Sequence, residues 1–284
     1  MRIYLDSRDL ITLIEKRSSE DIDRFEDRLR KNGSVLVFSM YNIMECCAPL
    51  VRGGEKSSVM KTLNRLEQLP HIYIAEARIH ALELQAAANA FLEQREYLPI
   101  ALPVVPRFDY AVCAFEEPAT KQYIQYGLAQ IVFELWHEDK SLFTGYSSQT
   151  KHLRATLESD RKRPDYRRHD LNFQNTVGRN LRLFNIGFPQ ESVGRLSAWI
   201  YENPARCPSH RLGYEVFHKL LRNLTDSGES SDIPDYAHIM CVPYVDMITL
   251  DKRMRGYVAQ VDQSIGTNFS HRVFADVSQI EASL

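Results

Sequence analysis

Apolar and polar positions follow two different periods over the first 75 residues of the chain. Short apolar runs that are typical of buried strands lie at 2–5, 34–39 and 71–75. Between these runs, apolar residues recur at helical spacing at 9–14, 18–32, 41–51 and 56–70. Because strands and helices alternate, this part of the sequence predicts an α/β fold with a mainly parallel sheet and right-handed crossovers.

The middle of the sequence shows helical periods without strand patterns. Helices are predicted at 76–96, 119–139, 148–161, 170–185, 190–202 and 210–224, with a proline-punctuated loop at 98–108. After a polar loop at 225–232, the pattern predicts a helix at 233–242, a strand at 244–250, a helix at 251–261 and a strand at 271–276. We therefore expect residues 1–75 and 231–284 to form an α/β core, and residues 76–230 to form a large all-helical insertion or lobe.

The composition is that of a soluble globular protein. Apolar residues make up 44% and charged residues 25% of the 284 residues, which disfavours a fibrous or disordered chain. The sequence contains no apolar run long enough to span a membrane and no signal-peptide pattern at its start. The five cysteines include no Cys-x-x-Cys pair, so we expect reduced thiols and a cytoplasmic location.

Positive charge is concentrated in one stretch of a chain whose formal net charge is −2. Residues 151–182 contain nine Lys or Arg residues against four Asp or Glu residues. Within this stretch the candidates for nucleic-acid binding are Arg161, Lys162, Arg163, Tyr166, Arg167 and Arg168. Cations for phosphates and an aromatic ring for stacking suit single-stranded RNA. A solvated loop between helices is the alternative interpretation.

Acidic residues follow several of the predicted strands. Asp6 comes directly after the first strand, and Glu45 lies about one and a half turns into the helix after the second. Asp235 lies in the first turn of the late helix, and Asp251 follows the strand at 244–250. Ligands of open parallel sheets bind beyond the carboxyl ends of the strands, so these acids are expected to converge there.

A cluster of carboxylates needs a cation, because the negative charges repel one another unless they are neutralised. Oxygen ligands without Cys or His suit Mg²⁺ or Mn²⁺, which can bind a scissile phosphate and lower the pKa of water for hydrolysis. The candidate metal ligands are Asp6, Glu45, Asp235, Asp246 and Asp251. Asp246 is an alternative to Asp251 as the fourth acid, because both flank the same strand. Asp232 is a further candidate ligand.

Three segments resemble the PIN domain, a fold of metal-dependent ribonucleases. They are IYLDS at 3–7, FSMYNIMEC at 38–46 and DIPDYAHIMCVPYVDMITLDKRM at 232–254. The resemblance implies a three-layer fold around a central, mainly parallel sheet, and an endoribonuclease that uses Mg²⁺ or Mn²⁺ to cleave single-stranded RNA. It implies a catalytic role for four acids, namely Asp6, Glu45, Asp235 and Asp251. It covers about residues 1–75 and 230–284 and does not extend to the middle of the chain.

Each acid also has a purely structural interpretation. Asp6 could cap the helix that follows it, and Asp235 could be a first-turn acid favoured by the helix dipole. Glu45 could pair with an arginine, and Asp251 could lie in a surface turn. The coincidence of all four with one architecture favours the metal site.

Other classes of protein fit the sequence less well. A dehalogenase-like phosphatase needs Asp or Thr where this chain has Arg8, and no glycine-rich nucleotide-binding motif is present. The main alternative is a catalytically inactive PIN-like scaffold that binds RNA or protein. The sequence does not decide whether the substrate is RNA or DNA. It also does not decide the oligomeric state or whether a regulatory protein partner exists. It assigns no role to His169 or His238.

Overall fold

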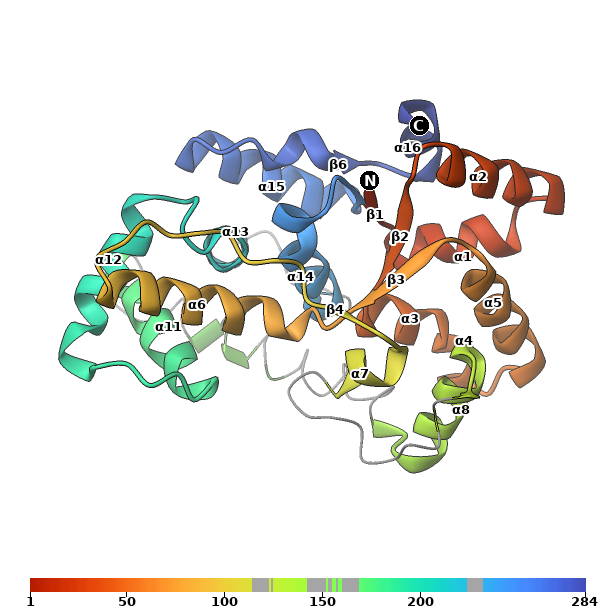
Figure 1. Cartoon of the computed structure of the whole chain (residues 1–284), viewed down its shortest axis with the longest axis horizontal. Coiled ribbons are helices and arrows are strands. Elements are labelled where there is room, and N and C mark those ends of the chain that lie inside the picture. Colours follow the sequence, from red (N-terminus) through yellow and green to blue (C-terminus); the bar gives the residue numbers. More distant parts are fainter. Residues whose placement is uncertain are drawn as a thin grey trace.

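The computed structural model describes the chain except for residues 114–122, 124, 142–151, 153–154, 157, 160–168 and 224–231. Its centre is a six-stranded sheet with helices on both faces (Figure 1). The strands are β1 (Arg2–Tyr4), β2 (Val35–Phe38), β3 (His71–Ile74), β4 (Val104–Val105), β5 (Met247–Thr249) and β6 (Val273–Phe274). The α/β class that the sequence predicts is therefore confirmed.

The strands lie in the order β4-β3-β2-β1-β5-β6, and only β4 is antiparallel to its neighbour. β2 pairs with one side of β1, and β3 pairs with the far side of β2. Later in the chain, β5 pairs with the other side of β1. The strand order therefore has its topological switch point between β1 and β5. In open α/β proteins, ligands commonly bind beyond the carboxyl ends of the strands at such a switch point.

The two faces of the sheet are buried in two separate clusters. Ile3 and Leu36 pack on one face, whereas Tyr4 and Val37, their neighbours in the sequence, pack on the other. The first face is covered by α1 (Ser7–Glu15), α2 (Ser19–Lys31), α3 (Met40–Cys46), α5 (Lys56–Gln68) and α16 (Val277–Ser283). The second is covered by α13 (Pro208–Arg222), α14 (Asp232–Cys241) and α15 (Lys252–Ile265). Burial on both faces explains why the strands read as apolar runs.

Two predicted helices differ from those observed. The helix predicted at 41–51 is divided into α3 and α4 (Ala48–Val51), because the ring of Pro49 would clash with the carbonyl of Glu45 in a continuous helix. The helix predicted at 119–139 is seen as α8 (Leu128–Glu138), which begins after Gly127 in extended conformation. The N–H of Leu128 donates to Glu67 Oε1 (2.7 Å), which fixes this start against α5.

In the described part of residues 76–230 the regular elements are helices, as predicted, except for the two residues of β4. Prolines flank β4 in the sequence, and an edge strand tolerates them. The helices are α6 (Ala77–Leu92), α7 (Phe108–Val112), α8, α11 (His169–Leu183), α12 (Val193–Glu202) and α13. Three short 3-10 turns complete the described chain, at Gln190–Ser192, Val242–Tyr244 and Phe269–Arg272.

Residues 76–230 share their packing with the sheet. Leu212 and Val216 of α13 lie in the cluster on the second face, and Leu128 of α8 lies in the cluster on the first. A third cluster, built around Phe173 and Leu84, joins α6, α11, α12 and α13 into a helical lobe (Figure 1). Among the described residues, no helix has the length and apolarity that a membrane crossing requires.

Candidate metal centre

Asp6 lies at the carboxyl end of β1, beside the switch point. Its backbone N–H donates to Thr249 Oγ1 (2.8 Å) at the end of β5, which joins the two strands there. Its carboxylate Oδ1 accepts from the N–H of Arg8 (3.0 Å) and so caps α1. The side chain is 8% exposed. The capping interpretation and the site interpretation of Asp6 are therefore compatible, because the cap fixes the carboxylate at the carboxyl ends of β1 and β5.

Glu45 of α3 meets Asp6 through Ser7. Ser7 Oγ lies 2.5 Å from Glu45 Oε2 and 3.2 Å from Asp6 Oδ1. A hydroxyl has one proton, so Ser7 can donate to only one of these two carboxylates at a time. Two acids are thus held together with one shared donor between them. This arrangement favours a bound cation, which would neutralise both charges.

His238 of α14 is the third member of the cluster. Its Nε2 lies 3.3 Å from Glu45 Oε2, and its Nδ1 lies 2.7 Å from the hydroxyl of Tyr4, which also contacts Ser39 Oγ at 2.7 Å. Burial acts to lower the pKa of His238, but the hydrogen bond to Glu45 and the charges of Glu45, Asp6 and Asp235 outweigh it and raise the pKa. The imidazole is therefore held in one orientation by its two partners.

The three residues together can hold a metal ion. One ligand atom each of Asp6, Glu45 and His238 lies within 4.8 Å of the others. Carboxylates are typical ligands of Mg²⁺ and Mn²⁺, whereas imidazole is typical of transition metals. The sequence predicted oxygen ligands alone, and the structure adds a nitrogen. A mixed set of this kind fits Mn²⁺ better than Mg²⁺.

Asp235 and Asp251 lie outside this set of three. Asp235 Oδ2 lies 3.7 Å from an amino nitrogen of Arg253, and its charge is close enough to raise the pKa of His238. Asp251 caps α15 by accepting from the N–H of Met254 (2.7 Å). The structure thus brings Asp6 and Glu45 together, as the sequence predicted, and leaves Asp235 and Asp251 engaged with other groups.

The structure places Asp246, one of the predicted metal ligands, away from Asp6, Glu45 and His238. Asp246 Oδ2 accepts from the N–H of Arg2 (2.7 Å), and the N–H of Asp246 donates to the carbonyl of Arg2 (2.9 Å). These contacts lie at the start of β1 and β5, whereas Asp6 follows the end of β1. Since the two strands are parallel, the residue before β5 lies at the opposite end of the strands from Asp6.

Three further predictions fall wholly or mostly on residues that the structure does not describe, and one of them is the helix predicted at 148–161. The basic residues Arg161, Lys162, Arg163, Tyr166, Arg167 and Arg168 lie outside the described part of the chain. The side chain of Asp232 lies outside it as well. The role of these residues stays a prediction.

Sequence reasoning missed two residues near the centre. His238 lies three residues after Asp235, so both face the same side of α14, and this spacing was the available signal. Glu76 follows β3 as Asp6 follows β1, in the similar strings IYIAE and IYLD. Glu76 accepts from the N–H groups of Met40 and Tyr41 (3.2 Å each), and burial raises its pKa to about 7. Glu76 therefore supports the start of α3, the helix that carries Glu45.

Comparisons with protein-family models, with curated proteins and with solved structures found no match to this chain. The chemistry of the centre is therefore inferred from the positions of Asp6, Glu45 and His238 and from their hydrogen-bond partners.

Binding of Mn²⁺ should stabilise the natural protein against unfolding. At a free metal concentration about 100 times the Kd, the expected gain is about 2.7 kcal/mol, seen as a rise in melting temperature. Asp6→Asn removes one ligand charge and should reduce the rise, whereas Asp246→Asn at the opposite edge is the matched control and should leave it intact. Equal shifts in both variants would show that Mn²⁺ binds elsewhere.

Proposed function

We propose that this protein is a metal-dependent endoribonuclease that hydrolyses phosphodiester bonds of single-stranded RNA. The observation that carries the proposal is the convergence of Asp6, Glu45 and His238 at the switch point of a mainly parallel sheet. Carboxylates and a histidine that converge at the carboxyl ends of parallel strands are typical of ligand-binding and catalytic sites. The order of the acids along the chain, which resembles that of PIN domains, supports a PIN-like fold and an RNA substrate.

The residues of the centre have separate roles in this proposal. Asp6 and Glu45 would bind the cation. Ser7 contacts both carboxylates through its hydroxyl and keeps them side by side. Tyr4 fixes the ring of His238, the third donor, in the way that outer partners orient metal-binding histidines. A divalent cation bound there would neutralise charge on the scissile phosphate and lower the pKa of an attacking water.

Asp235 and Asp251 would act from the border of the centre. Their carboxylates are engaged by Arg253 and by the first turn of α15, respectively. Negative charge at these positions adds to the local potential that attracts a divalent cation. We infer that they tune the affinity for the metal, whereas Asp6 and Glu45 hold it.

Cleavage of single-stranded RNA and single-stranded DNA of the same sequence, assayed side by side, tests the proposal. Each substrate is incubated with Mg²⁺, with Mn²⁺ or with chelator. We expect RNA to be cut with Mn²⁺, more slowly with Mg²⁺, and not in chelator. Binding of RNA without cleavage under every metal condition would favour the inactive RNA-binding scaffold. Preferential cleavage of DNA would overturn the choice of substrate.

The basic stretch should contribute to RNA affinity. Replacement of Arg161, Lys162, Arg163, Arg167 and Arg168 by alanine should weaken RNA binding and flatten its dependence on salt. Each lost phosphate contact is expected to reduce the slope of log affinity against log salt by about 0.7.

A control for this experiment removes three positive charges from another surface. Arg24, Arg30 and Lys31 are exposed on α2 and can be replaced by alanine together. RNA affinity should then be nearly unchanged. If both multiple variants lose affinity equally, the basic stretch has no special role, and only the total charge matters.

A further inference from the structure

Arg8 is a cation at the border of the metal centre, two residues after Asp6 in the first turn of α1. The N–H of Arg8 donates to Asp6 Oδ1 (3.0 Å), so its backbone is fixed by the same cap that holds the Asp6 carboxylate. The side chain of Arg8 is 55% exposed. The guanidinium is therefore tied to the centre through the chain and is open to solvent.

One nitrogen of the guanidinium holds the side chain in place. Arg8 Nη2 donates to Asp9 Oδ2 (3.2 Å), a buried carboxylate, and to the carbonyl of Ala275 (3.0 Å), the residue after β6. Because β1, β5 and β6 run parallel, Ala275 and Asp6 lie at the same, carboxyl ends of their strands. These contacts place the guanidinium at the level of the metal centre, on the β6 side of Asp6.

Other donors of Arg8 remain for a ligand. A guanidinium carries five N–H donors in a planar fork, and the contacts with Asp9 and Ala275 both use Nη2. Nε and Nη1 have no partner among the residues that the structure describes. Two neighbouring donors of this kind match two oxygens of a phosphate group. Arg8 can therefore keep its contact with Asp9 while its other edge binds a phosphate.

The acids around Arg8 maintain its positive charge. Partial burial acts to lower the pKa of Arg8, but its contact with Asp9 and the charges of Asp6 and Asp251 outweigh this effect and raise the pKa. The same acids repel the backbone of RNA, and a divalent cation at the centre would offset that repulsion for the scissile phosphate. A fixed guanidinium beside the centre would offset it for a second phosphate.

We propose that Arg8 binds the RNA phosphate next to the scissile one, with Nε and Nη1 donating to its non-bridging oxygens. This inference rests on the proposed nuclease activity, because the metal centre defines which phosphate is cut. Glu45 reaches the centre from α3, which follows β2, whereas the guanidinium of Arg8 lies toward β6. An RNA strand that crosses the carboxyl ends of the strands would therefore meet the metal and Arg8 in succession.

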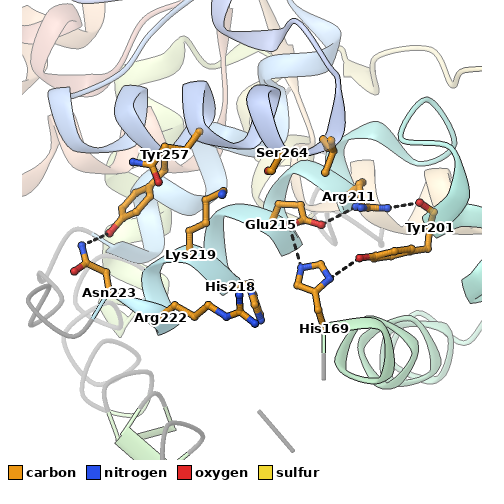
Figure 2. A pocket seen from close by; sticks show the side chains of 12 residues that line it. His169, Tyr201, Arg211, Glu215, His218, Lys219, Arg222, Asn223, Tyr257 and Ser264 are labelled. Atoms are coloured by element: carbon orange, nitrogen blue, oxygen red, sulfur yellow. Dashed lines mark hydrogen bonds and ion pairs between the residues drawn. The ribbon is translucent and has the colours of Figure 1, made fainter. Parts of the chain in front are cut away.

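Lys219 is a second cation with available donors, at a place apart from the metal centre. It is half-buried in a polar pocket of about 530 Å³ between α13 and α15 (Figure 2). Its side chain has no hydrogen-bond or ion-pair partner within the described part of the chain. The pocket lies along the later turns of α15, from Tyr257 to Ser264, whereas this helix begins at the border of the centre, after Asp251. Lys219 therefore tests whether any available cation can take the role of Arg8.

Short single-stranded RNAs with one neutral linkage test the proposal in Mn²⁺. Each RNA has one unmodified ribose, at the linkage to be cut, and O-methylated riboses elsewhere. The first RNA has charged phosphodiesters throughout, and two others carry a neutral methylphosphonate on the 5′ side or on the 3′ side of the cut. For the natural protein, one of the two neutral linkages should lower kcat/KM about tenfold, because a hydrogen bond between charged groups is lost.

Arg8→Met separates phosphate binding from a structural role. It should lower kcat/KM for the fully charged RNA about tenfold, and the neutral linkage should then have no further effect, because its partner is already absent. A purely structural role would lower all rates by one factor and preserve the natural sensitivity to the neutral linkage, and that result would overturn the proposal. Arg8→Gln is the second variant, should Arg8→Met fail to fold.

Arg30→Met and Lys219→Met are the controls. Arg30 is an exposed arginine of α2 that pairs with Glu26 (2.8 Å), as Arg8 pairs with Asp9. Both control variants should keep the natural rate and the natural sensitivity to the neutral linkage. Loss of that sensitivity in Lys219→Met would place the second phosphate in the pocket and contradict its assignment to Arg8.

The same RNAs distinguish failure of this inference from failure of the proposed function. Cleavage by the natural protein that is insensitive to both neutral linkages would overturn the role of Arg8 and leave the nuclease proposal intact. If the natural protein cuts none of the RNAs, the nuclease proposal fails, and equilibrium affinities in Mn²⁺ replace the rates. A neutral linkage that weakens binding to the natural protein, and not to Arg8→Met, would then still support phosphate binding by Arg8. Equal affinities for all the RNAs would overturn it.

Discussion

Replacement of Asp6 by asparagine is expected to lower metal-dependent RNA cleavage by more than about 100-fold. Loss of an outer partner of a metal site already costs about 10–100-fold, and Asp6 is proposed as a direct ligand. Asparagine keeps the shape of the side chain and can still accept from the N–H of Arg8, so the cap of α1 should survive. The measurement is the initial rate of cleavage of labelled single-stranded RNA in Mn²⁺.

Stability without metal should distinguish loss of a ligand from loss of the fold. Asp6 and Glu45 both carry negative charge beside Ser7, so Asp6→Asn removes a repulsion. The free energy of unfolding in chelator should therefore be unchanged or higher than that of the natural protein. Asp246→Asn is the matched control and should retain full activity. Cleavage by Asp6→Asn at the natural rate would exclude Asp6 from the centre.

Replacement of Glu83 by alanine is expected to destabilise the protein by about 3–5 kcal/mol. Glu83 of α6 is fully buried and accepts from the N–H groups of Ser209 and His210 (2.8 Å each) and from the hydroxyl of Tyr244. Alanine would leave these buried donors without an acceptor and would detach α6 from the start of α13. Urea unfolding followed by circular dichroism measures the loss.

Glu93→Ala provides the control for this variant. Glu93 lies at the end of α6 and pairs with Arg95 on the exposed surface, where an ion pair contributes at most about 1 kcal/mol. If Glu83→Ala loses no more stability than Glu93→Ala, the carboxylate of Glu83 does not join the lobe to α13. Glu83→Gln keeps one acceptor oxygen, so its loss of stability should lie between those of Glu83→Ala and Glu93→Ala.

The pH dependence of stability is a second readout of Glu83. Burial raises the pKa of Glu83 to about 7 from its ordinary 4.5, although the hydrogen bonds from Tyr244, His210 and Ser209 oppose this rise. A raised pKa means that the folded state binds the proton more tightly than the unfolded state does. The stability that this proton contributes should be fully present below pH 4.5 and lost as the pH rises through about 7. Relative to Glu83→Gln, the natural protein should therefore become less stable over this interval.

The main strands and two of the site residues could be predicted because their signals are local. A run of three apolar residues, Ile3, Tyr4 and Leu5, followed by an acid identifies both β1 and Asp6. Glu45 follows from the position of the second strand and the helix after it. Asp246 was misplaced because the strand at 244–250 has an acid at either end, and only strand direction distinguishes them. In a parallel sheet the acid after the strand lies at the carboxyl ends of the strands, where ligands commonly bind, and the acid before it lies at the other end.

The rest of the site depends on contacts between distant segments. His238 gains its place from Tyr4 and Glu45, which lie 234 and 193 residues away in the sequence. The spacing of His238 from Asp235 indicates that both face the same side of α14, but it does not indicate these partners. The pocket between α13 and α15 likewise arises from the facing sides of two helices, and helical periodicity does not indicate which sides will meet.

Hydrolysis of single-stranded RNA in water enriched in the heavy oxygen isotope tests the proposed chemistry most directly. If the centre of Asp6, Glu45 and His238 directs water at the phosphate, the new terminal phosphate should contain one heavy oxygen atom, as measured by mass spectrometry. Labelled product should form with Mn²⁺ and not in chelator. Attack by the ribose hydroxyl would instead leave an unlabelled cyclic phosphate. A cyclic product, or equal cleavage in chelator, would contradict a metal-dependent hydrolase.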